Sequence, residues 1–182
     1  LWVILTSIMR IISGTHKGKR LNAPSILPIR PTTDRAKEAL FNIMENRYYF
    51  DGKNVLDLFS GTGNIAYEFA SRGCNDITAI DNNSNCINYI NSTAIKFSFN
   101  ITTIKSDCYK YLENCKQQFN FIFVDPPYDY SLYEKIKTLI FENDLVKKEG
   151  CLIIEHDKNT TFNNQNMELR KYGTVHFSIF SF

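Results

Sequence analysis

"NVLDLFSGTGNIAYEFASRG", residues 54–73, is the segment that decides the fold. Its first part, "NVLDLF", is a short apolar run that predicts a buried strand. Its last part, "NIAYEFASRG", predicts a helix that ends at Gly73. The glycines between them let the backbone approach a ligand closely, so we expect a ligand at the carboxyl end of this strand.

The same strand-and-helix alternation continues along most of the chain. The further predicted strands and helices are residues 76–81, 84–97, 101–106, 108–115, 119–125, 132–143 and 150–157. Strands separated by helices of this length predict βαβ units, and hence an α/β fold with a mostly parallel sheet and helices on both faces. The closing run "MELRKYGTVHFSIFSF", residues 167–182, predicts a C-terminal antiparallel hairpin.

The N-terminal part predicts a small β-hairpin followed by a helix. The runs "RIIS" (residues 10–13) and "KRLNA" (residues 19–23) flank the glycine-containing loop "GTHKG". Apolar residues then recur at helical spacing over residues 34–47, with Thr33 or Asp34 as the N-cap.

We expect one compact unit with an N-terminal extension, residues 1–50, and a main domain, residues 51–182. The first eight residues, "LWVILTSI", are apolar but far shorter than the ~20 residues that a membrane span needs. They also lack the charged region of a signal peptide. They are either an extension upstream of a start at Met9 or an extra edge strand, and no membrane association is expected.

Composition limits the functional classes. With 43% hydrophobic and 22% charged residues, the chain has the composition of a folded, soluble protein. The five cysteines form no C-x-x-C pair and the three histidines lack metal-ligand spacing, so neither a disulfide framework nor a metal site is expected. This cysteine usage favours a reducing, cytoplasmic location.

Basic residues concentrate near the N-terminus, although the net charge of the chain is only +2. Between Met9 and Lys37, a single acid, Asp34, opposes the seven cations Arg10, Lys17, Lys19, Arg20, Arg30, Arg35 and Lys37. This asymmetry indicates an anionic partner for the N-terminal part. The alternative is a solvated basic surface without a partner.

Two ligands compete for the glycine loop. Gly61, Gly63 and Ala66 form a G-x-G-x-x-A pattern, and Asp81 lies 20 residues after Gly61, as in a dinucleotide-binding site. Asp57, however, lies just before the glycines, where its charge would repel a pyrophosphate. The same carboxylate would attract the ammonium and sulfonium groups of S-adenosylmethionine, which we therefore favour.

Two further strand-end acids fit this cofactor. Asp81 can accept both ribose hydroxyls, and Asp107, after the following strand, is placed to accept the adenine amino group. Each acid alone is more simply explained as an ordinary strand-end cap. Three acids after three successive strands, together with the glycine loop, favour S-adenosylmethionine.

"VDPPYDY", residues 124–130, supplies the groups that a methyl acceptor needs. Two consecutive prolines cannot continue a sheet, so the strand stops at Asp125. The Asp125 carboxylate and the Pro126 carbonyl can accept the protons of an exocyclic amine, and the Tyr128 ring offers a stacking face. Pro127 helps to hold this geometry. The alternative is a strand-terminating turn with a packing tyrosine.

A family resemblance rests on these segments. "VLDLFSGTGN" and "VDPPY" resemble those of class I, S-adenosylmethionine-dependent amino-methyltransferases. "RIISGTHKGKRL", "RPTTDRAKEALFNIM" and "LRKYGTVHFSIF" extend the likeness to residues 9–182, which resemble the bacterial methyltransferases that modify N2 of guanine 966 in 16S rRNA. This resemblance implies a Rossmann-like seven-stranded sheet, a "DPPY" motif that holds the target base and an N-terminal hairpin that faces RNA.

The resemblance also implies roles for individual residues. The implied cofactor-binding residues are Asp57, Gly61, Gly63, Asp81 and Asp107, and we expect Thr32, Phe59 and Cys108 to contact the cofactor as well. The implied catalytic set is Asp125, Pro126, Pro127 and Tyr128. The candidates for RNA binding are Arg10, Lys17, Lys19, Arg20, Arg30 and Arg35. The expected partner is ribosomal RNA within a small subunit or an assembly intermediate, bound by a monomer.

The segment "RPTT", residues 30–33, is expected to close over the cofactor. A cation in the first turn of a helix is unfavourable, which indicates that Arg35 serves another purpose. We expect Arg35, or Arg30, to meet an RNA phosphate. The alternative for Arg35 is a surface ion pair with Asp34 or Glu38.

One departure from the family is "NIAYEFA", in which Asn64 and Tyr67 stand where small residues are usual, so that cofactor affinity can differ.

Three other functions compete with guanine-N2 methylation. DNA adenine-N6 methylation is disfavoured because the predicted elements leave no sizeable insert to read a duplex. Protein glutamine methylation more commonly has "NPPY". A non-catalytic RNA-binding module is disfavoured by the intact Asp125 and Tyr128.

Overall fold

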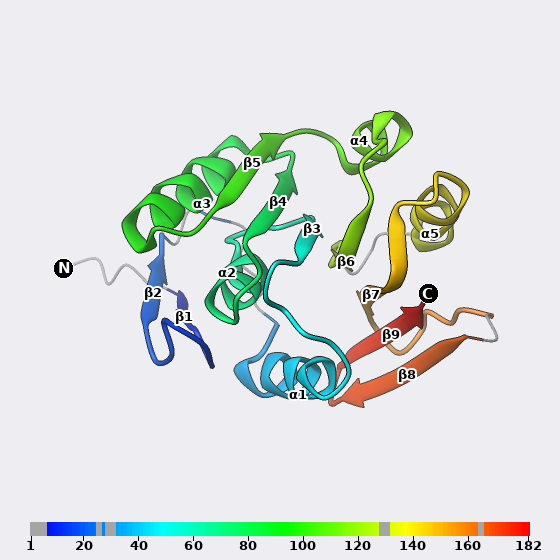
Figure 1. The fold of residues 1–182 in the computed structure, drawn as a ribbon, viewed down its shortest axis with the longest axis horizontal. Helices are drawn as coiled ribbons and strands as arrows, with labels where there is room; N and C mark the ends of the chain where they lie inside the picture. The colour runs from blue at the N-terminus through cyan, green and yellow to red at the C-terminus, as the bar shows by residue number, and fades with distance from the viewer. Residues whose placement is uncertain (1–6, 25–26, 28–31, 128–131, 164–165) are drawn as a thin grey trace.

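The computed structural model describes residues 7–24, 27, 32–127, 132–163 and 166–182 (Figure 1). Its main strands are β3 (Asn54–Leu58), β4 (Asp76–Asp81), β5 (Ile101–Lys105), β6 (Phe119–Val124), β7 (Val146–His156), β8 (Met167–Tyr172) and β9 (Val175–Ser181). Its helices are α1 (Asp34–Glu45), α2 (Asn64–Ser71), α3 (Ser84–Phe97), α4 (Cys108–Asn114) and α5 (Tyr133–Glu142). In these ranges no helix is long and apolar enough to cross a membrane.

The seven main strands form one sheet in the order β5-β4-β3-β6-β7-β9-β8. The strands from β5 to β7 pair in parallel, whereas β9 pairs antiparallel with both β7 and β8. The predicted mostly parallel sheet with an antiparallel C-terminal hairpin is therefore confirmed. Strand β7 begins at Val146, before the predicted start at Gly150, and a register shift against β6 accommodates these extra residues.

Helices cover both faces of the sheet. Side chains of α1, α2 and α3 share one hydrophobic cluster with Val55 and Phe123, whereas side chains of α4 and α5 share another with Leu56 and Ile122. Neighbouring residues of a strand thus point into different clusters, as the alternation of side chains requires. Because both faces are buried, the strands are nearly continuous apolar runs, which explains why the sequence predicted them well.

The N-terminal hairpin is present, but its first strand is displaced from the prediction. Strand β1 (Ser7–Arg10) pairs antiparallel with β2 (Arg20–Ala23), so the expected first strand at residues 10–13 is wrong. The backbone N–H groups of Ile12 and Ser13 donate instead to the Glu68 carboxylate on α2, at 2.8 and 3.1 Å. A side chain of the main domain therefore replaces the partner strand at these residues.

The hairpin loop packs closely against the end of α2. The Thr15 N–H donates to the Ser71 carbonyl at 2.7 Å, and the Ser71 hydroxyl donates to the Ser13 carbonyl at 2.6 Å. Gly14 has φ of +83°, and a Cβ atom there would lie 1.8 Å from the Ser71 carbonyl oxygen. The His16 ring contacts the rings of Phe97 and Phe99 edge-on. The hairpin thus follows α2 towards its C-terminal end.

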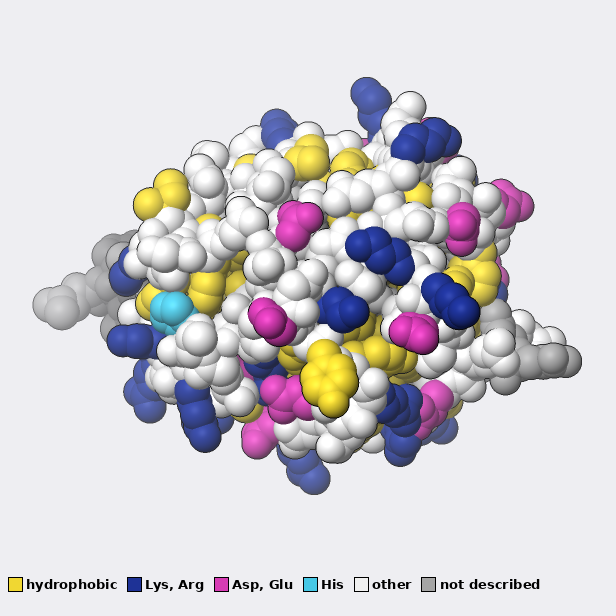
Figure 2. Space-filling view, viewed as in Figure 1, with side chains coloured by type: hydrophobic (Ala, Val, Ile, Leu, Met, Phe, Trp, Pro, Cys, Tyr) yellow, Lys and Arg dark blue, Asp and Glu magenta, His cyan; other side chains and the backbone are white. Residues whose placement is uncertain are grey.

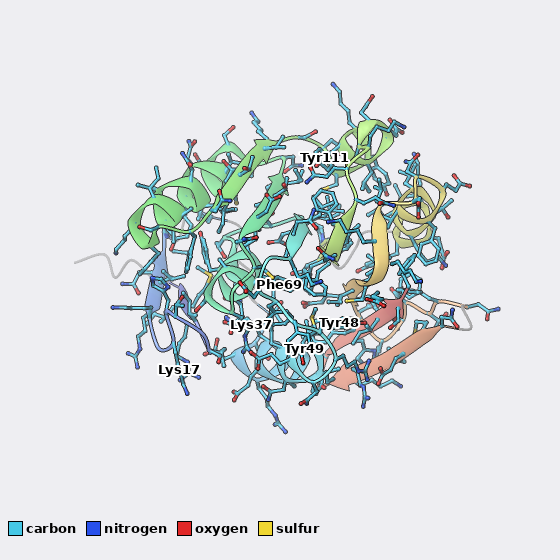
Figure 3. All side chains as sticks on the ribbon, in the orientation of Figure 1. Lys17, Lys37, Tyr48, Tyr49, Phe69 and Tyr111 are labelled. Atoms are coloured by element: carbon cyan, nitrogen blue, oxygen red, sulfur yellow. The ribbon has the colours of Figure 1, made fainter. Side chains whose placement is uncertain are left out.

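A buried ion cluster joins the hairpin, α1 and α2. The Lys37 ammonium is fully buried and donates to the Arg10 carbonyl at 2.7 Å and to Asn64 Oδ1 at 2.8 Å; its distance to Glu68 Oε2 is 3.5 Å. Arg72 Nε donates to Glu68 Oε1 at 2.7 Å. Burial lowers the pKa of Lys37 although Glu68 attracts the charged form. Figure 3 shows Lys37 between α1 and α2, whereas Lys17 extends outward from the hairpin loop.

We expect Glu68→Gln to lower the free energy of unfolding by about 3–5 kcal/mol, because it leaves the Lys37 charge buried without its counter-ion. An amide also offers two N–H donors to a site that already contains the N–H groups of Ile12 and Ser13. Denaturant titration followed by circular dichroism measures the change.

Glu38→Gln provides the matched control, because Glu38 is an exposed glutamate on the neighbouring helix. It should change the free energy of unfolding by less than about 0.5 kcal/mol. Equal stabilities of the two variants would show that the buried cluster contributes nothing net to stability.

Candidate active site

Three strand-end carboxylates meet at the carboxyl edge of the sheet. Asp57 pairs in register with Ala79 on β4 and with Phe123 on β6. Asp81 lies two residues after Ala79, and Asp125 lies two residues after Phe123. Because side chains alternate along a strand, all three carboxylates belong to the face of the sheet that α1, α2 and α3 cover.

The glycine loop turns sharply between β3 and α2. Phe59, Gly61 and Gly63 all have positive φ angles, of 59°, 52° and 80°. A left-handed conformation is strained for a residue such as Phe59, and such strain concentrates at functional sites. The Gly61 N–H donates to Asp81 Oδ2 at 2.8 Å, which ties the loop to the end of the neighbouring strand. The structure therefore brings the predicted loop and Asp81 together.

The two glycines of the loop differ in what surrounds them. A Cβ atom on Gly61 would meet only the Phe59 carbonyl oxygen, at 3.9 Å, so this position has room for a ligand. A Cβ atom on Gly63 would lie 2.7 Å from the Tyr67 ring and 2.9 Å from the Ile90 side chain. Tyr67 is fully buried and fills the space beside Gly63. The packing of Tyr67 and Ile90 against this position therefore requires a glycine.

Asp57 is a buried acid that could pair with a cation. Its side chain is 2% exposed, and among the described residues its Oδ2 has no hydrogen-bond partner. Burial raises the pKa of the Asp57 carboxyl to about 8; the backbone N–H of Ala66 opposes the shift and the Asp81 charge adds to it. An ammonium group would satisfy the unpaired oxygen and restore the ionised form. The residues present therefore fit the ammonium group of S-adenosylmethionine.

Asp107 and Cys108 follow β5, the next strand of the sheet. Asp107 Oδ1 accepts the N–H groups of Tyr109 and Lys110 at 2.9 and 3.1 Å, so this acid does cap α4. Its contact with adenine stays a prediction. Cys108 is buried, and burial raises the pKa of its thiol to about 12 despite a hydrogen bond with the Phe59 backbone. Cys108 is therefore not a nucleophile, and its predicted contact with the cofactor stays a prediction.

The acceptor motif begins directly beside the glycine loop. The Asp125 N–H donates to the Leu58 carbonyl at 3.4 Å, which continues the pairing of β6 with β3. Asp125 is half-buried, Pro126 is buried and Pro127 is exposed. Tyr128 lies outside the described residues, so its stacking role stays a prediction.

Sequence reasoning missed Glu155, which lies next to the end of β7. This side chain is 3% exposed, and its Oε2 accepts the hydroxyl of Thr32 at 2.6 Å. The Thr32 hydroxyl therefore donates its proton within the protein, and its predicted contact with the cofactor stays a prediction. The signal was available, because an acid after the apolar "LII" is the same pattern that identified Asp57 and Asp81.

Most of the predicted RNA-binding residues are exposed on the hairpin. Arg10, Lys17, Lys19 and Arg20 are exposed, and Figure 2 shows Lys and Arg side chains gathered at the end of the molecule where Figure 1 places the hairpin. Arg10 Nε lies 3.3 Å from Asp34 Oδ2. An exposed pair of this kind is worth at most about 1 kcal/mol and does not prevent a contact with phosphate.

The other basic residues of the N-terminal segment differ from one another. Arg35 is exposed in the first turn of α1, and Asp34, one of its two expected ion-pair partners, instead pairs with Arg10. Arg30 lies outside the described residues. Lys37 is buried, so it does not contribute to a basic surface.

The stability of wild type relative to Asp57→Asn should fall as the pH rises from about 4 to about 8. The pKa of Asp57 in the folded protein lies above its ordinary value of 3.8, so the folded state binds this proton more tightly than the unfolded state. The stabilisation is present below about pH 4 and is lost as the pH rises through about 8, by at most about 1.4 kcal/mol per pH unit. Denaturant titrations of both proteins across this range measure the difference.

Asn is the matched substitution because it keeps an acceptor for the Ala66 N–H and cannot titrate. Parallel pH profiles of the two proteins would contradict the raised pKa. As a second readout, binding of S-adenosylmethionine to wild type near pH 7 should release protons, which calorimetry in buffers of different ionisation enthalpy detects.

Comparisons with known proteins agree with this site. A family model described as "Conserved hypothetical protein 95" matches residues 9–181. The chain is 34% identical over 155 residues to "Putative rRNA methyltransferase YlbH" of Bacillus subtilis (strain 168), which covers 82% of this chain and 83% of that protein. It is 29% identical over 183 residues to "Ribosomal RNA small subunit methyltransferase D" of Buchnera aphidicola subsp. Baizongia pistaciae (strain Bp), covering 97% and 92%.

A solved structure, "Putative methyltransferase yhhF from Escherichia coli", superposes with a TM-score of 0.82 at 26% identity. The superposition covers 96% of this chain and 98% of that chain. The chain therefore belongs to the family described as "Conserved hypothetical protein 95", and it is an S-adenosylmethionine-dependent methyltransferase.

Proposed function

We propose that this enzyme methylates the exocyclic N2 amine of a guanine in the 16S RNA of the small ribosomal subunit, at the position equivalent to guanine 966. The observation that carries the proposal is that the glycine loop and the acceptor motif begin side by side. The Asp125 N–H donates to the Leu58 carbonyl, so the acceptor motif starts beside the loop that contains Gly61. The methyl donor and the acceptor amine can therefore meet at one edge of the sheet.

The cofactor end of the site is formed by three acids and the glycine loop. S-adenosylmethionine supplies an electrophilic methyl group. Asp57 would hold its ammonium group, Asp81 its ribose hydroxyls and Asp107 its adenine amino group. Gly61 leaves room for the close approach of the cofactor to the backbone.

The acceptor end would activate a weak nucleophile. The lone pair of an exocyclic amine is delocalised into the base, so the nitrogen must rehybridise before it attacks. The Asp125 carboxylate and the Pro126 carbonyl would hold the two amine protons while this happens, and Asp125 can take the proton that the product loses. Tyr128 would stack on the base. No covalent intermediate is needed, because positioning supplies most of the rate enhancement.

The hairpin would bind the RNA backbone. Along β1 and β2, Met9 and Leu21 face the core, whereas Arg10 and Arg20 face solvent directly opposite each other. Cations on an exposed face fit phosphates, which carry most of the affinity for RNA. The names of the two relatives, "Putative rRNA methyltransferase YlbH" and "Ribosomal RNA small subunit methyltransferase D", support RNA as the substrate.

Asp125→Ala should lower kcat on small-subunit RNA by about 10²-fold or more, because it removes an acceptor of the amine protons. The dissociation constant of S-adenosylmethionine should hardly change. The assay transfers a labelled methyl group from the cofactor to small-subunit RNA from cells that lack the enzyme, and then maps the label.

The map distinguishes the competing functions. Label on N2 of a guanine supports the proposal. The same assay with DNA or with protein as the acceptor tests the alternatives, and label on adenine N6 or on glutamine there, without label on the RNA, would replace it. Near-normal turnover of a folded Asp125→Ala protein would remove Asp125 from the mechanism. Glu142→Ala, at an exposed acid on α5, serves as the control for an acid-to-alanine change.

Replacing Lys17, Lys19 and Arg20 with alanine should flatten the salt dependence of RNA binding. Each phosphate contact contributes a slope of about −0.7 to −0.9 in log K against log salt concentration, so the slope should fall by roughly two to three units. RNA affinity should fall at low salt while cofactor affinity stays constant. Binding titrations at several salt concentrations measure the slope.

The matched control replaces three exposed lysines outside the hairpin, Lys116, Lys148 and Lys171. This triple variant has the same loss of net charge and should keep the wild-type slope. If both triple variants lose the same slope, the effect is one of net charge. An unchanged slope in the hairpin variant would mean that RNA binds another face.

A further inference from the structure

A buried hydrogen bond joins the N-terminal segment to the acceptor side of the site. The Thr32 hydroxyl donates to Glu155 Oε2 at 2.6 Å, and the two side chains are only 5% and 3% exposed. The bond links residues that are 123 positions apart in the chain. A buried carboxylate is costly unless it is hydrogen-bonded, and its neighbours Ile153 and Ile154 are apolar. A strand selected for stability alone would favour an apolar residue here, so Glu155 calls for a functional reason.

The sheet places Glu155 beside the acceptor motif. Ile153 pairs with Phe123, and Glu155 and Asp125 each lie two residues further along their neighbouring parallel strands. Glu155 also pairs with Phe177, which belongs to the cluster beneath α1, α2 and α3. Glu155 and Asp125 therefore share one face of the sheet, on strands that are about 4.8 Å apart.

Thr32 places the start of α1 at the same edge. Thr33 is the N-cap of this helix and accepts the Ala36 N–H at 3.2 Å, so Thr32 directly precedes the first turn. That turn carries the exposed Arg35, and Asp34, which pairs with Arg10 of the hairpin. A contact at Thr32 therefore determines where these charges lie relative to the acceptor motif.

We propose that Glu155 is a positioning residue: through Thr32 it holds the first turn of α1, with Arg35, next to the acceptor motif, where Arg35 meets an RNA phosphate close to the target nucleotide. This inference rests on the proposed function, because it requires RNA as the ligand. It explains why Arg35 occupies the turn of a helix that disfavours a cation. It also assigns the Thr32 hydroxyl to Glu155 and not to the cofactor.

Thr32→Val removes the hydroxyl and keeps the shape of the side chain. It should raise the KM for RNA, or the dissociation constant of RNA, by about tenfold or more, as expected for a lost hydrogen bond to a charged group. The dissociation constant of S-adenosylmethionine should stay within about twofold. Thr32→Ser keeps the hydroxyl donor and Glu155→Gln keeps an acceptor. Each of these single variants should therefore retain most of the wild-type RNA affinity.

A double-mutant cycle separates positioning from plain stability. Arg35→Gln should weaken RNA binding by a similar factor to Thr32→Val, and the combined variant should be no weaker than either, because both changes remove one contact. Circular dichroism checks that each variant is folded at the assay temperature. Glu38→Gln, at an exposed acid on the same helix, is the control for a surface change.

The outcomes distinguish this inference from the proposed reaction. RNA binding by wild type with coupled Thr32 and Arg35, but without methylation, would contradict the reaction and support the inference. Wild-type RNA affinity in folded Thr32→Val, or independent effects in the cycle, would overturn the inference alone. A large loss of cofactor affinity in Thr32→Val would show that Thr32 serves the cofactor, and would overturn the inference. A wild-type protein that binds no RNA would overturn both.

Discussion

The parallel pairing of β3 with β6 is the constraint on which the site depends. These strands are 66 residues apart in the chain, yet Leu58 pairs with Val124 at the ends of both. Because parallel strands end at the same edge, the two loops that follow must begin side by side. One loop offers glycines and follows the strand that carries the buried Asp57, and the other offers Asp125 and two prolines. Neither loop forms a site alone, and their adjacency follows from backbone pairing and not from contacts between their side chains.

The Glu68 carboxylate joins the N-terminal segment to the main domain. Four donors converge on it: two backbone N–H groups of the segment after β1, and the side chains of Lys37 and Arg72. Burying such a cluster costs desolvation energy, and apolar residues of the same volume could be equally stable. They could not bind a particular pair of N–H groups, however. The cluster therefore gives the hairpin a defined position on α2, the helix that begins at the glycine loop.

The sequence predicted most of the sheet because its strands are buried on both faces, and the predicted bounds of β4 and α3 are those observed. It also identified the strand-end acids, since an acid after an apolar run is unusual. The sequence-based predictions failed where contacts with side chains distant in the sequence determine the local structure. Nothing local shows that Glu68 would bind the N–H groups of Ile12 and Ser13, or that Lys37 would be the buried member of a basic segment. Those outcomes depend on how α1 and α2 pack.

Charge separates the two partners that the proposed reaction must bring together. The carboxyl edge gathers Asp57, Asp81 and Asp125. The carboxylates of Asp81 and Asp125 would repel phosphates, and Asp57 would pair with the cationic cofactor once its carboxyl ionises. Exposed cations lie instead on the hairpin and on the first turn of α1. An RNA chain would therefore be held beside the acidic edge and not over it, so that a neutral base, and not its phosphate, extends into the site. A chain of net charge +2 achieves this by the placement of its charges and not by their number.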